Sequence, residues 1–494
     1  MLFLTELLTN YQGSLFLSGN AEKLPVTTIT ADSRQVTGGA VFVAIRGNNI
    51  DGSVYIAQAV EKGAVAIVTD NEGPIEVPPT VALVRVDNAR LALAKMAEAL
   101  YAPQPTHIAA VTGTDGKTST ADFLRQLWEM SELKAASIGT LGVIGPQTGI
   151  VFPAVNTTPD PVQLHQTLHA LASKGCQHVA MEASSHGLHQ YRLDGVHLRA
   201  AAFTNLTRDH LDYHKTPEAY FQAKSRLFSE LLPASGTAVL NADDTQFKAL
   251  EEICNKQGIK IISYGQNGKD YTIKKITHRI DGLAVQASIE GKSQHFMLNM
   301  VGEFQVMNAL AALGLFVSCG GALEDGLKHL PHLHNVKGRL ERVATHPSGA
   351  PIFIDYAHTP AALANVLKTV RKHVEGKLVV VFGCGGDRDK GKRPEMGKAA
   401  TELADIVIVT DDNPRSEDPD AIRAEIMKEA PNAKNIGDRA EAIATAIKSL
   451  NSGDFLLIAG KGHENTQIIG SKVTPFNDAE VARYAVKLCE QRFG

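Results

Sequence analysis

Short apolar strands alternate with helical segments along most of this chain, and this alternation restricts its fold more than any other feature. We expect strands at residues 107–112, 179–182, 201–205, 237–241, 352–355, 378–382, 406–410 and 455–459. Strands that alternate with helices form parallel sheets with helices packed on their faces. The sequence therefore predicts an α/β fold. Polar residues that follow the strands should meet at one edge of each sheet, where such sheets bind ligands.

The length of the chain and its prolines divide it into domains. A single hydrophobic core stops growing near roughly 250–300 residues, and this chain has 494. A predicted helix at 88–100 ends before Pro103 and Pro105, which mark a boundary. We predict a small mixed α/β N-terminal domain (1–102), a central domain with a parallel sheet (103–335) and a C-terminal Rossmann-like α/β domain (336–494). Further strands are expected at 40–45, 64–69 and 81–86, with shorter ones between 260 and 300.

Charge and cysteine content limit the partners and the environment. The net charge is −4, so bulk charge does not favour binding to nucleic acid or to a membrane. Five scattered cysteines without a C-x-x-C pair fit a reducing cytoplasm better than a disulfide framework. The first residues lack the basic and apolar regions of a signal peptide. The uncharged stretch 304–323 is interrupted by Gln305, Asn308 and glycines, so we expect a buried core helix rather than a membrane span.

Residues 113–119, Gly-Thr-Asp-Gly-Lys-Thr-Ser, lie between an apolar strand and a helix that we expect to begin near Ser119. This context is typical of a phosphate-binding loop, in which backbone N–H groups at a helix N-terminus hold phosphate oxygens. Lys117 would neutralise phosphate charge, and the hydroxyl of Thr118 could bind Mg²⁺. The first glycine of the full Walker pattern would fall at Val111, so a glycine-rich turn with a solvated lysine is the alternative.

Further polar groups follow the neighbouring strands. Glu182 ends a predicted strand, where a carboxylate can hold a metal or cap a helix. Residues 208–214 hold two imidazoles, two carboxylates and an arginine, which suggests a metal or phosphate site, although a solvated polar loop has the same pattern. No thiolate lies near in the sequence, so Mg²⁺ is favoured over zinc. By the pattern of its helix alone, Lys224 would be a surface lysine.

Four motifs in a fixed order resemble those of the Mur ligases. They are residues 113–119, Glu-Ala-Ser-Ser-His at 182–186, Asn-Leu-Thr-Arg-Asp-His-Leu-Asp-Tyr-His at 205–214 and Asp-Tyr-Ala-His at 355–358. The similarity extends from Asp-Ser-Arg at 32–34 to Gly-His-Glu at 462–464, nearly the whole chain. Mur ligases have a UDP-binding N-terminal domain, a central P-loop ATPase domain and a C-terminal domain that brings in an amino acid. The resemblance therefore implies a cytoplasmic, ATP-dependent ligase of peptidoglycan precursor synthesis.

The resemblance implies specific roles around ATP and Mg²⁺. The catalytic residues would be Lys117, Glu182, His210 and Lys224. The metal ligands would be Thr118, Glu182, His210 and a carbamate on Lys224, because a carbamate turns a cationic side chain into an anionic oxygen ligand. The residues that bind ATP would be Gly113, Thr114, Asp115, Gly116, Lys117, Thr118, Ser119, Asn308, Arg339, Asp355 and His358. Asp115 departs from the family, in which asparagine is usual at this position.

Two further sets of residues match the substrate sites of the family. The UDP-linked substrate would contact Ala31, Ser33, Asn48, Asn49, Ile50, Asn156, Thr157, Thr158, Ser184, Gln190 and Arg192. The amino acid would contact Arg388, Asp412, Asn413, Pro414, Arg415, Gly460 and Glu464. Asn-Pro-Arg at 413–415 is the version found in the branch that adds meso-diaminopimelate. Arg415 offers a bidentate partner for the far carboxylate of this diamino acid, and Glu464 could receive its far ammonium.

The resemblance implies a two-step reaction, with three alternative functions left open. In it, the D-glutamate γ-carboxylate of UDP-N-acetylmuramoyl-L-alanyl-D-glutamate attacks ATP, and diaminopimelate then attacks the acyl phosphate. We expect a monomer without nucleic-acid or membrane partners.

A lysine-adding member of the family would leave Arg415 unpaired. A folylpolyglutamate synthetase shares the acyl-phosphate route but needs neither a UDP-type N-terminal domain nor Arg415. A non-catalytic nucleotide-binding relative would need only the phosphate loop.

Overall fold

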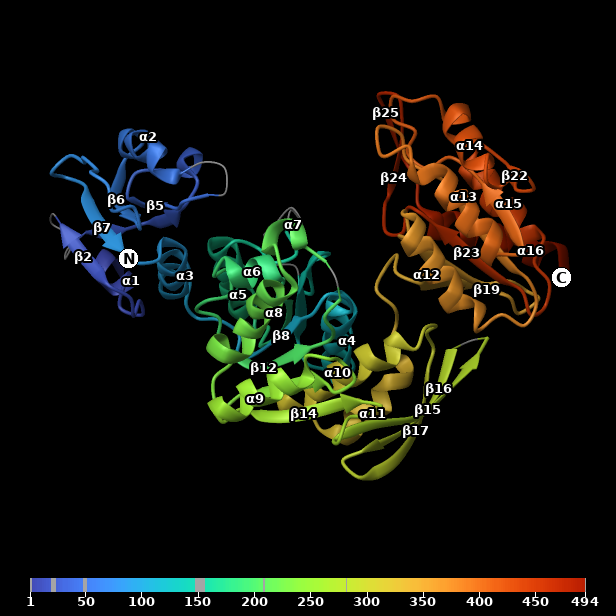
Figure 1. Cartoon of the computed structure of the whole chain (residues 1–494), viewed down its shortest axis with the longest axis horizontal. Coiled ribbons are helices and arrows are strands. Elements are labelled where there is room, and N and C mark those ends of the chain that lie inside the picture. The colour runs from blue at the N-terminus through green and yellow to red at the C-terminus, as the bar shows by residue number, and fades with distance from the viewer. Residues whose placement is uncertain are drawn as a thin grey trace. The chain divides into compact units, whose positions relative to one another are not determined.

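The computed structural model describes residues 2–18, 24–47, 51–146, 156–207, 209–280 and 282–493 (Figure 1). The chain divides into two compact units. The first comprises Met1–Thr272 and Met307–His329, and the second comprises Ile273–Val306 and Leu330–Gly494. The predicted α/β class is confirmed, because the main sheet of each unit consists largely of parallel strands covered by helices.

The N-terminal part of the first unit contains a sheet with the strand order β2-β7-β6-β5-β4. Its strands are β2 (Leu15–Ser18), β4 (Thr28–Thr30), β5 (Ala40–Ala44), β6 (Ala64–Thr69) and β7 (Ala82–Val86), and β1 (Leu2–Phe3) pairs separately with β3 (Pro25–Val26). Helix α3 (Ala89–Leu100) packs on this sheet, and the side chain of Asn88 caps it by accepting from the N–H of Leu91. Helices α1 (Leu4–Leu7) and α2 (Ile56–Glu61) are too short to reveal a helical period in the sequence.

The central sheet of the first unit has the order β10-β9-β11-β8-β12-β13-β14. Its strands are β8 (His107–Thr112), β9 (Ala135–Gly139), β10 (Gly142–Ile144), β11 (His178–Glu182), β12 (Leu198–Phe203), β13 (Thr237–Asn241) and β14 (Lys260–Gly265). β9 and β10 are antiparallel, and the other neighbours are parallel. The polar segments that follow β11, β8 and β12 therefore lie at the same edge of the sheet, as the sequence predicts.

The helices of the first unit cover this sheet. They are α4 (Lys117–Met130), α5 (Pro161–Ser173), α6 (Ser185–His189), α7 (Leu211–His214), α8 (Pro217–Arg226), α9 (Phe247–Gln257) and α11 (Leu323–His329). Helix α10 (Phe304–Ser318) is buried along most of its length, as predicted. Within the described ranges, no helix is long and apolar enough to cross a membrane.

Three strands that follow β14 in the sequence are longer than the short elements expected there. They are β15 (Tyr271–Arg279), β16 (Gly282–Ile289) and β17 (Lys292–Leu298). The first residues of β15 pair with β14, and β16 and β17 form an antiparallel hairpin. Their alternating burial pattern, with one face exposed, explains why continuous apolar runs do not mark them in the sequence.

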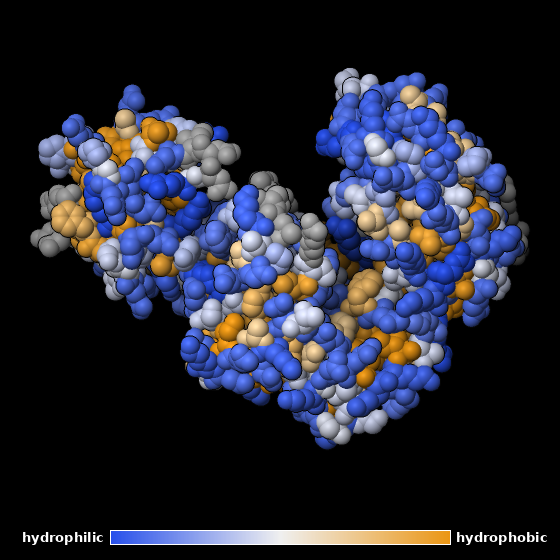
Figure 2. Space-filling view, in the orientation of Figure 1, coloured by the Kyte–Doolittle hydropathy of each residue, from blue (hydrophilic) through white to orange (hydrophobic). Residues whose placement is uncertain are grey.

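The second unit contains a sheet with the order β18-β19-β23-β20-β21-β22. Its strands are β18 (Glu341–Thr345), β19 (Pro351–Asp355), β20 (Leu378–Phe382), β21 (Ile406–Val409), β22 (Lys434–Asn435) and β23 (Phe455–Ala459). One face is covered by α12 (Pro360–Arg371), α13 (Lys392–Leu403) and α14 (Pro419–Met427), and the other by α15 (Arg439–Lys448) and α16 (Asp478–Phe493). A hairpin of β24 (Thr466–Ile469) and β25 (Lys472–Pro475) follows β23. Hydrophilic residues predominate on the visible surface over β25 and α14 (Figure 2).

The five cysteines are all buried, and each has a free thiol. Burial raises the pKa of Cys176 above its usual value, and it raises the pKa values of Cys254, Cys319 and Cys384 to about 12. These three thiols are therefore protonated at neutral pH.

A fully buried ion pair joins α15 to α16 in the second unit. The guanidinium of Arg439 donates to both carboxylate oxygens of Asp478 at 2.8 Å, and to the carbonyl oxygen of Ala459 at 3.0 Å. Both charged side chains are 0% exposed. Removal of one partner would leave the other charge buried and unpaired, which costs about 3–5 kcal/mol.

We therefore expect Asp478→Asn to lower the free energy of unfolding of the second unit by about 3–5 kcal/mol. Urea denaturation of the full chain, followed by circular dichroism, measures this change. Glu490→Gln, which removes an exposed carboxylate from the same helix, serves as the matched control and should leave the transition in place. Equal transitions for Asp478→Asn and the wild type would contradict the expected role of the pair.

Candidate active site

The phosphate loop connects β8 to α4. Helix α4 begins at Lys117, two residues before the expected start, because Gly116 occupies the N-cap position with a left-handed φ of 82°. A Cβ atom at Gly116 would lie 2.4 Å from the side-chain oxygen of Asn308. One at Gly113 would lie 1.9 Å from the hydroxyl of Thr204. Packing therefore requires glycine at both positions, and the loop leads into a helix N-terminus, which is the geometry that binds phosphate.

Lys117 folds back over this loop. Its ammonium group donates to the carbonyl oxygens of Gly113 at 3.0 Å and Thr114 at 2.8 Å. Burial lowers the pKa of Lys117, and the nearby carboxylates of Glu182 and Asp115 partly offset this effect. Phosphate oxygens can replace the two carbonyls as hydrogen-bond acceptors, so the position of Lys117 is compatible with a bound nucleotide.

Glu182 ends β11 beside the phosphate loop and is 2% exposed. Its Oε1 accepts from the hydroxyl of Thr118 at 2.9 Å and from the N–H of Thr140 at 2.8 Å, and its Oε2 accepts from the hydroxyl of Thr140 at 3.2 Å. Burial raises the pKa of Glu182, while these donors and Lys117 oppose that shift. Thr140 also lies 3.2 Å from the hydroxyl of Thr157, one of the predicted substrate residues.

This group of oxygen atoms fits Mg²⁺. Thr118 and Glu182 offer hard oxygen donors, which Mg²⁺ prefers. Mg²⁺ at nucleotide sites usually keeps several waters and binds one or two carboxylates together with phosphate oxygens. A closed protein cage is therefore unnecessary, and the described part of the chain contains no cluster of three or more His, Cys, Asp or Glu side chains that could form one.

Lys224 lies on α8 and is 1% exposed, so the surface position expected from its helix pattern is wrong. Its amino group donates to the carbonyl oxygen of Gly113 at 2.6 Å and lies 4.5 Å from the centre of the Tyr220 ring. Burial, together with repulsion from Lys117, lowers the pKa of Lys224 to about 6. The amine is therefore largely uncharged at neutral pH and available as a nucleophile.

His210 belongs to a group of aromatic side chains from α6, α7 and α8. Its ring centre lies 4.9 Å from that of His186 and 6.0 Å from that of Tyr220. Its Nε2 is 3.4 Å from the carboxylate of Asp209. His210 and Lys224 thus both neighbour Tyr220, whereas Thr118 and Glu182 contact each other directly. Between His210 and Glu182 we find no hydrogen bond or ion pair within the described ranges.

A cavity of about 490 Å³ lies between the N-terminal sheet and the start of α5. It is lined by Thr28, Ile29, Thr30, Ala31, Asp32, Gln35, Ile45, Arg90, Leu93, Asp160, Pro161, Val162, Gln163, Gln166, Gln190 and Arg192. Three predicted residues for the UDP-linked substrate, Ala31, Gln190 and Arg192, are among them. Arg192 also donates to Gln190 and to the carbonyl oxygen of Thr158, both at 2.7 Å. The cavity is therefore polar and holds charges of both signs, from Arg90 and Arg192 and from Asp32 and Asp160.

The other predicted substrate residues have different surroundings. The hydroxyl of Ser33 donates to Gln58 at 2.8 Å. The hydroxyl of Thr158 donates to the carbonyl oxygen of Glu182 at 2.9 Å, and Ser184 caps helix α6. Thr158 and Ser184 thus support the strand end that carries Glu182. Asn156 is exposed. The remaining predicted residues lie outside the described part of the chain: Asn48, Asn49 and Ile50.

The predicted nucleotide residues of the second unit form a local group at the end of β19. Asp355 is buried and accepts from the N–H groups of Leu340 and Ala357, both at 2.8 Å. Burial raises its pKa, and these hydrogen bonds oppose that shift. The guanidinium of Arg339 lies 4.8 Å from the centre of the Tyr356 ring, and His358 is exposed beside the same ring. Arg339, before β18, and His358, after β19, thus offer a cation and an imidazole beside the Tyr356 ring.

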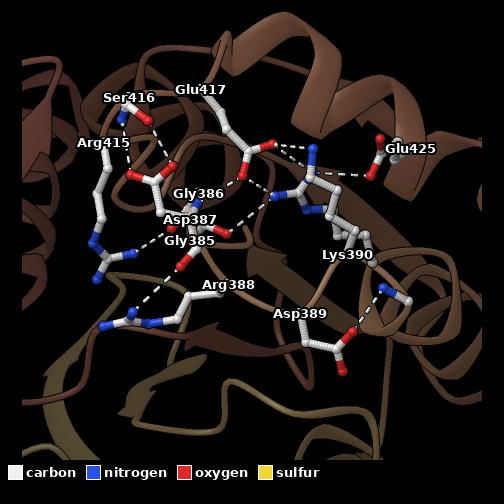
Figure 3. Close-up of polar contacts among 12 residues, drawn as sticks. Gly385, Gly386, Asp387, Arg388, Asp389, Lys390, Arg415, Ser416, Glu417 and Glu425 are labelled. Atoms are coloured by element: carbon white, nitrogen blue, oxygen red, sulfur yellow. Dashed lines mark hydrogen bonds and ion pairs between the residues drawn. The ribbon is translucent and has the colours of Figure 1, made fainter.

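Two arginines meet at the loop after β20. Arg415 donates to the carbonyl oxygen of Gly386 at 2.7 Å, and Arg388 donates to that of Asp387 at 3.3 Å. Both guanidinium groups extend to the same side of this loop (Figure 3). Two neighbouring guanidinium groups favour the binding of a carboxylate, because each can donate charge-assisted hydrogen bonds to its oxygens.

The backbone around Arg415 is held by the β24–β25 hairpin. Arg415 has a left-handed φ of 53°, an uncommon conformation for a residue other than glycine. Its N–H donates to the carbonyl oxygen of Ile468 at 3.0 Å, and its own carbonyl oxygen accepts from Gly470 at 2.6 Å. A Cβ atom at Gly386 would lie 1.9 Å from the carbonyl oxygen of Pro414, so the two loops are in direct contact. The hairpin and the loop after β20 therefore set the direction of the Arg415 side chain.

Acidic groups lie at the ends of the neighbouring strands. Asp412 is buried after β21, and burial raises its pKa. A Cβ atom at Gly460 would lie 2.7 Å from its Oδ2 atom, which explains glycine after β23. Glu464 accepts a hydrogen bond from Asn413 at 2.9 Å. The second unit thus combines a pair of arginines with a separate pair of carboxylates.

Sequence reasoning missed three residues at these sites. Arg90 and Asp160 line the cavity, and Thr140 binds Glu182. None of the three belongs to a motif named above; Asp160 lies two residues after Thr158, whereas Thr140 reaches Glu182 from 42 residues away. A signal was available only for Arg90, since it begins a helix just after a strand end, where ligands often bind.

The comparisons with known proteins agree over nearly the whole chain. Residues 25–101 match the model described as Mur ligase family, catalytic domain; residues 111–316 match the Mur ligase middle domain; and residues 338–462 match the Mur ligase, glutamate ligase domain. The UDP-N-acetylmuramoyl-L-alanyl-D-glutamate–2,6-diaminopimelate ligase of Mesorhizobium japonicum is 48% identical, over 97% of this chain and 99% of its own. The ligase of the same name from Bradyrhizobium diazoefficiens is 49% identical, over 94% and 95%.

A solved structure agrees with the sequence relatives. A structure of a UDP-N-acetylmuramoyl-L-alanyl-D-glutamate–2,6-diaminopimelate ligase matches with a TM-score of 0.75 and 34% identity, over 94% of this chain and 96% of that chain. Sequence identity near one half over almost the full length of several relatives leaves no room for a different family. The chain belongs to the Mur ligase family.

Proposed function

We propose that the chain is the ATP-dependent ligase that joins meso-diaminopimelate to the D-glutamate γ-carboxylate of UDP-N-acetylmuramoyl-L-alanyl-D-glutamate. The observation that carries the proposal is the arrangement of Arg388 and Arg415 at one side of the amino-acid site, with Asp412 and Glu464 at the neighbouring strand ends. A diamino acid with two carboxylates needs cationic partners for its carboxylates and acidic partners for its ammonium groups. The names of relatives that are 48% identical to this chain support the same substrates.

In the first step, an oxygen of the substrate γ-carboxylate attacks the γ-phosphorus of ATP, and ADP leaves. Phosphoryl transfer depends on positioning and electrostatics more than on covalent help. Lys117 and the N–H groups at the start of α4 offset the charge that gathers on the phosphoryl oxygens. Two Mg²⁺ ions, for which Thr118, Glu182, His210 and the Lys224 carbamate would provide the ligands, would supply further positive charge there.

In the second step, the amine of meso-diaminopimelate attacks the acyl phosphate, the C–O bond to phosphate breaks, and an amide and inorganic phosphate result. Arg388 and Arg415 orient the far carboxylate, and Asp412 and Glu464 receive the ammonium group that does not react. The UDP-linked substrate occupies the cavity beside Ala31 and Arg192. We place the enzyme in the cytoplasm as a monomer and assign its three family regions to domains 1–102, 103–335 and 336–494.

Phosphate release tests the proposal. The full chain is assayed with ATP, Mg²⁺ and UDP-N-acetylmuramoyl-L-alanyl-D-glutamate, with meso-diaminopimelate, L-lysine or L-glutamate as the acceptor. Turnover with diaminopimelate alone supports the proposal. Turnover with lysine alone would make the chain a lysine-adding ligase, and glutamate addition to a folate would make it a folylpolyglutamate synthetase. ATP binding without turnover in any mixture would leave a non-catalytic relative.

Substitution of Glu182 tests the proposed Mg²⁺ site. Glu182→Gln keeps the size of the side chain and removes its charge, so we expect kcat to fall about 100-fold, in the range typical of groups that support a bound metal. The Mg²⁺ concentration at half-maximal rate should rise as well. Glu251→Gln, on the partly exposed helix α9, is the matched control. An unchanged Mg²⁺ dependence in Glu182→Gln would contradict the assignment.

A further inference from the structure

Lys461 is a fully buried cation that the proposed function leaves without a role. It follows β23 in Gly-Lys-Gly-His-Glu at 460–464, and its side chain is 0% exposed. Its ammonium group donates to Oδ1 of Asn413 at 3.1 Å and to Oε2 of Glu464 at 3.2 Å. A buried ammonium group is unfavourable unless it is paired. Both partners of Lys461 belong to the proposed amino-acid site, so the cation acts where diaminopimelate would bind.

The contacts of Lys461 fix the orientation of the Asn413 amide. Oδ1 of Asn413 accepts from Lys461 and from the N–H of Ile468, the latter at 3.0 Å. Its Nδ2 is therefore turned toward Glu464 and donates to Oε2 at 2.9 Å. Without the cation, Oδ1 would keep a single donor, and the amide could rotate. Lys461, together with the N–H of Ile468, thus holds the amide of Asn413 with its Nδ2 toward the carboxylate.

The same contacts leave one oxygen of Glu464 for a ligand. Oε2 of Glu464 takes two donors, from Lys461 and Asn413. Oε1 accepts no hydrogen bond from the part of the chain that the structure describes, and the side chain is 32% exposed. A carboxylate held at one oxygen and open at the other presents a single, oriented acceptor. An ammonium group is the donor that best matches it.

The charges around Lys461 leave room for one cation. Arg439 and Asp478 neutralise each other at 2.8 Å, and Lys461 neutralises Glu464 at 3.2 Å. The remaining charge is on Asp412, whose Oδ2 lies against Gly460. Three carboxylates thus face two cations, with an excess of one negative charge. Removal of Lys461 would double this excess and would change the number of cations that the site can hold.

We propose that Lys461 is a positioning residue for the acceptor amino acid. It orients Asn413 and Glu464 toward an ammonium group and limits the acidic end of the site to one unpaired charge. This inference rests on the proposed function, because it takes an amino acid with a second ammonium group as the ligand. Lys461 itself acts through Asn413 and Glu464, without contact with the reacting atoms.

Steady-state kinetics of Lys461→Met in the full chain test the inference. We expect the KM for meso-diaminopimelate to rise about 10- to 100-fold, in the range found for residues that orient a ligand-binding group. The KM values for ATP and for the UDP-linked substrate should stay within about twofold, since no partner of Lys461 belongs to those sites. Lys472→Met removes an exposed lysine from the nearby hairpin and is the matched control. A parallel rise of all three KM values would indicate a general structural defect and would overturn the inference.

A double-mutant cycle separates positioning from an independent effect. Glu464→Gln removes the charge through which Lys461 is proposed to act. If the inference holds, the double variant Lys461→Met with Glu464→Gln has a diaminopimelate KM within about threefold of the weaker-binding single variant. The inference would be overturned if the rise in diaminopimelate KM of the double variant equalled the product of the two single rises. It would also be overturned if Lys461→Met had the KM of the wild type. Wild-type protein without diaminopimelate-dependent turnover would instead overturn the proposed function, and this inference with it.

Discussion

Lys224→Ala is expected to lower kcat about 100- to 1000-fold, the loss typical when one preorganised electrostatic group is removed from an active site, here the charge that would hold Mg²⁺ beside the phosphoryl group. The proposed charge is a carbamate, formed when the uncharged amine attacks CO2 and releases a proton. Burial and the neighbouring Lys117 lower the pKa of Lys224 to about 6. Above pH 6 the amine is mostly neutral and can react, whereas below pH 6 it is protonated and cannot. The carbamate should therefore be lost as the pH falls through about 6.

Two measurements check this expectation. Wild-type enzyme in buffer depleted of CO2 should lose activity and regain it when bicarbonate is added. Lys224→Ala should not respond to bicarbonate alone, but a short carboxylate such as acetate or formate should restore part of its activity by supplying the missing anionic oxygens. Lys256→Ala, an exposed lysine of α9, is the matched control. Activity of Lys224→Ala within about threefold of wild type would rule out the carbamate as a required group.

Arg415→Ala should produce the second large effect, on acceptor choice. Charge-assisted hydrogen bonds contribute about 1.5–3 kcal/mol each, so loss of a bidentate pair corresponds to roughly 100- to 10,000-fold in kcat/KM for meso-diaminopimelate. The wild-type guanidinium is held by the hairpin and by Gly386, so little reorganisation is needed when the carboxylate binds. Arg415→Lys should recover only part of the loss, because an ammonium group cannot pair with both oxygens in the same geometry.

The lysine acceptor provides an internal control for Arg415. L-lysine lacks the far carboxylate, so its slow or absent turnover should change little in Arg415→Ala. The ratio of kcat/KM values for diaminopimelate and lysine is the decisive quantity, since a misfolded site would lower both values. A ratio equal to that of the wild type would show that Arg415 does not determine the choice of acceptor. Arg388 would then remain as the candidate for binding the far carboxylate.

The strands were the part of the fold that the sequence predicted best. β8, β13, β20 and β23 begin and end at the predicted residues, because each contains a continuous apolar run and is buried on both faces. The position of the sites at the strand ends follows from the same pattern. The start of α4 was predicted two residues late, because a left-handed glycine at the N-cap has no side-chain signal.

The surroundings of individual site residues could not be predicted in the same way. Lys224 shares its helix face with the apolar residues Tyr220, Leu227 and Phe228, but a lysine at such a position is ordinarily expected to extend to the surface. Its partner Gly113 is 111 residues away in the sequence. Lys461 likewise reaches Asn413 across 48 residues. Such contacts depend on the order of strands in the sheet, which the local sequence does not reveal.

The burial of all five cysteines has a practical consequence for spectroscopy. Thiol reagents attack the thiolate, and they need access to it. Buried thiols, three of them with pKa values of about 12, should react slowly with maleimides while the protein is folded. A cysteine introduced on the exposed face of α9 and another on that of α16 would then be the preferred labelling sites on the wild-type background. Energy transfer between two fluorophores placed there would follow the separation of the two units during turnover, without prior removal of the native cysteines.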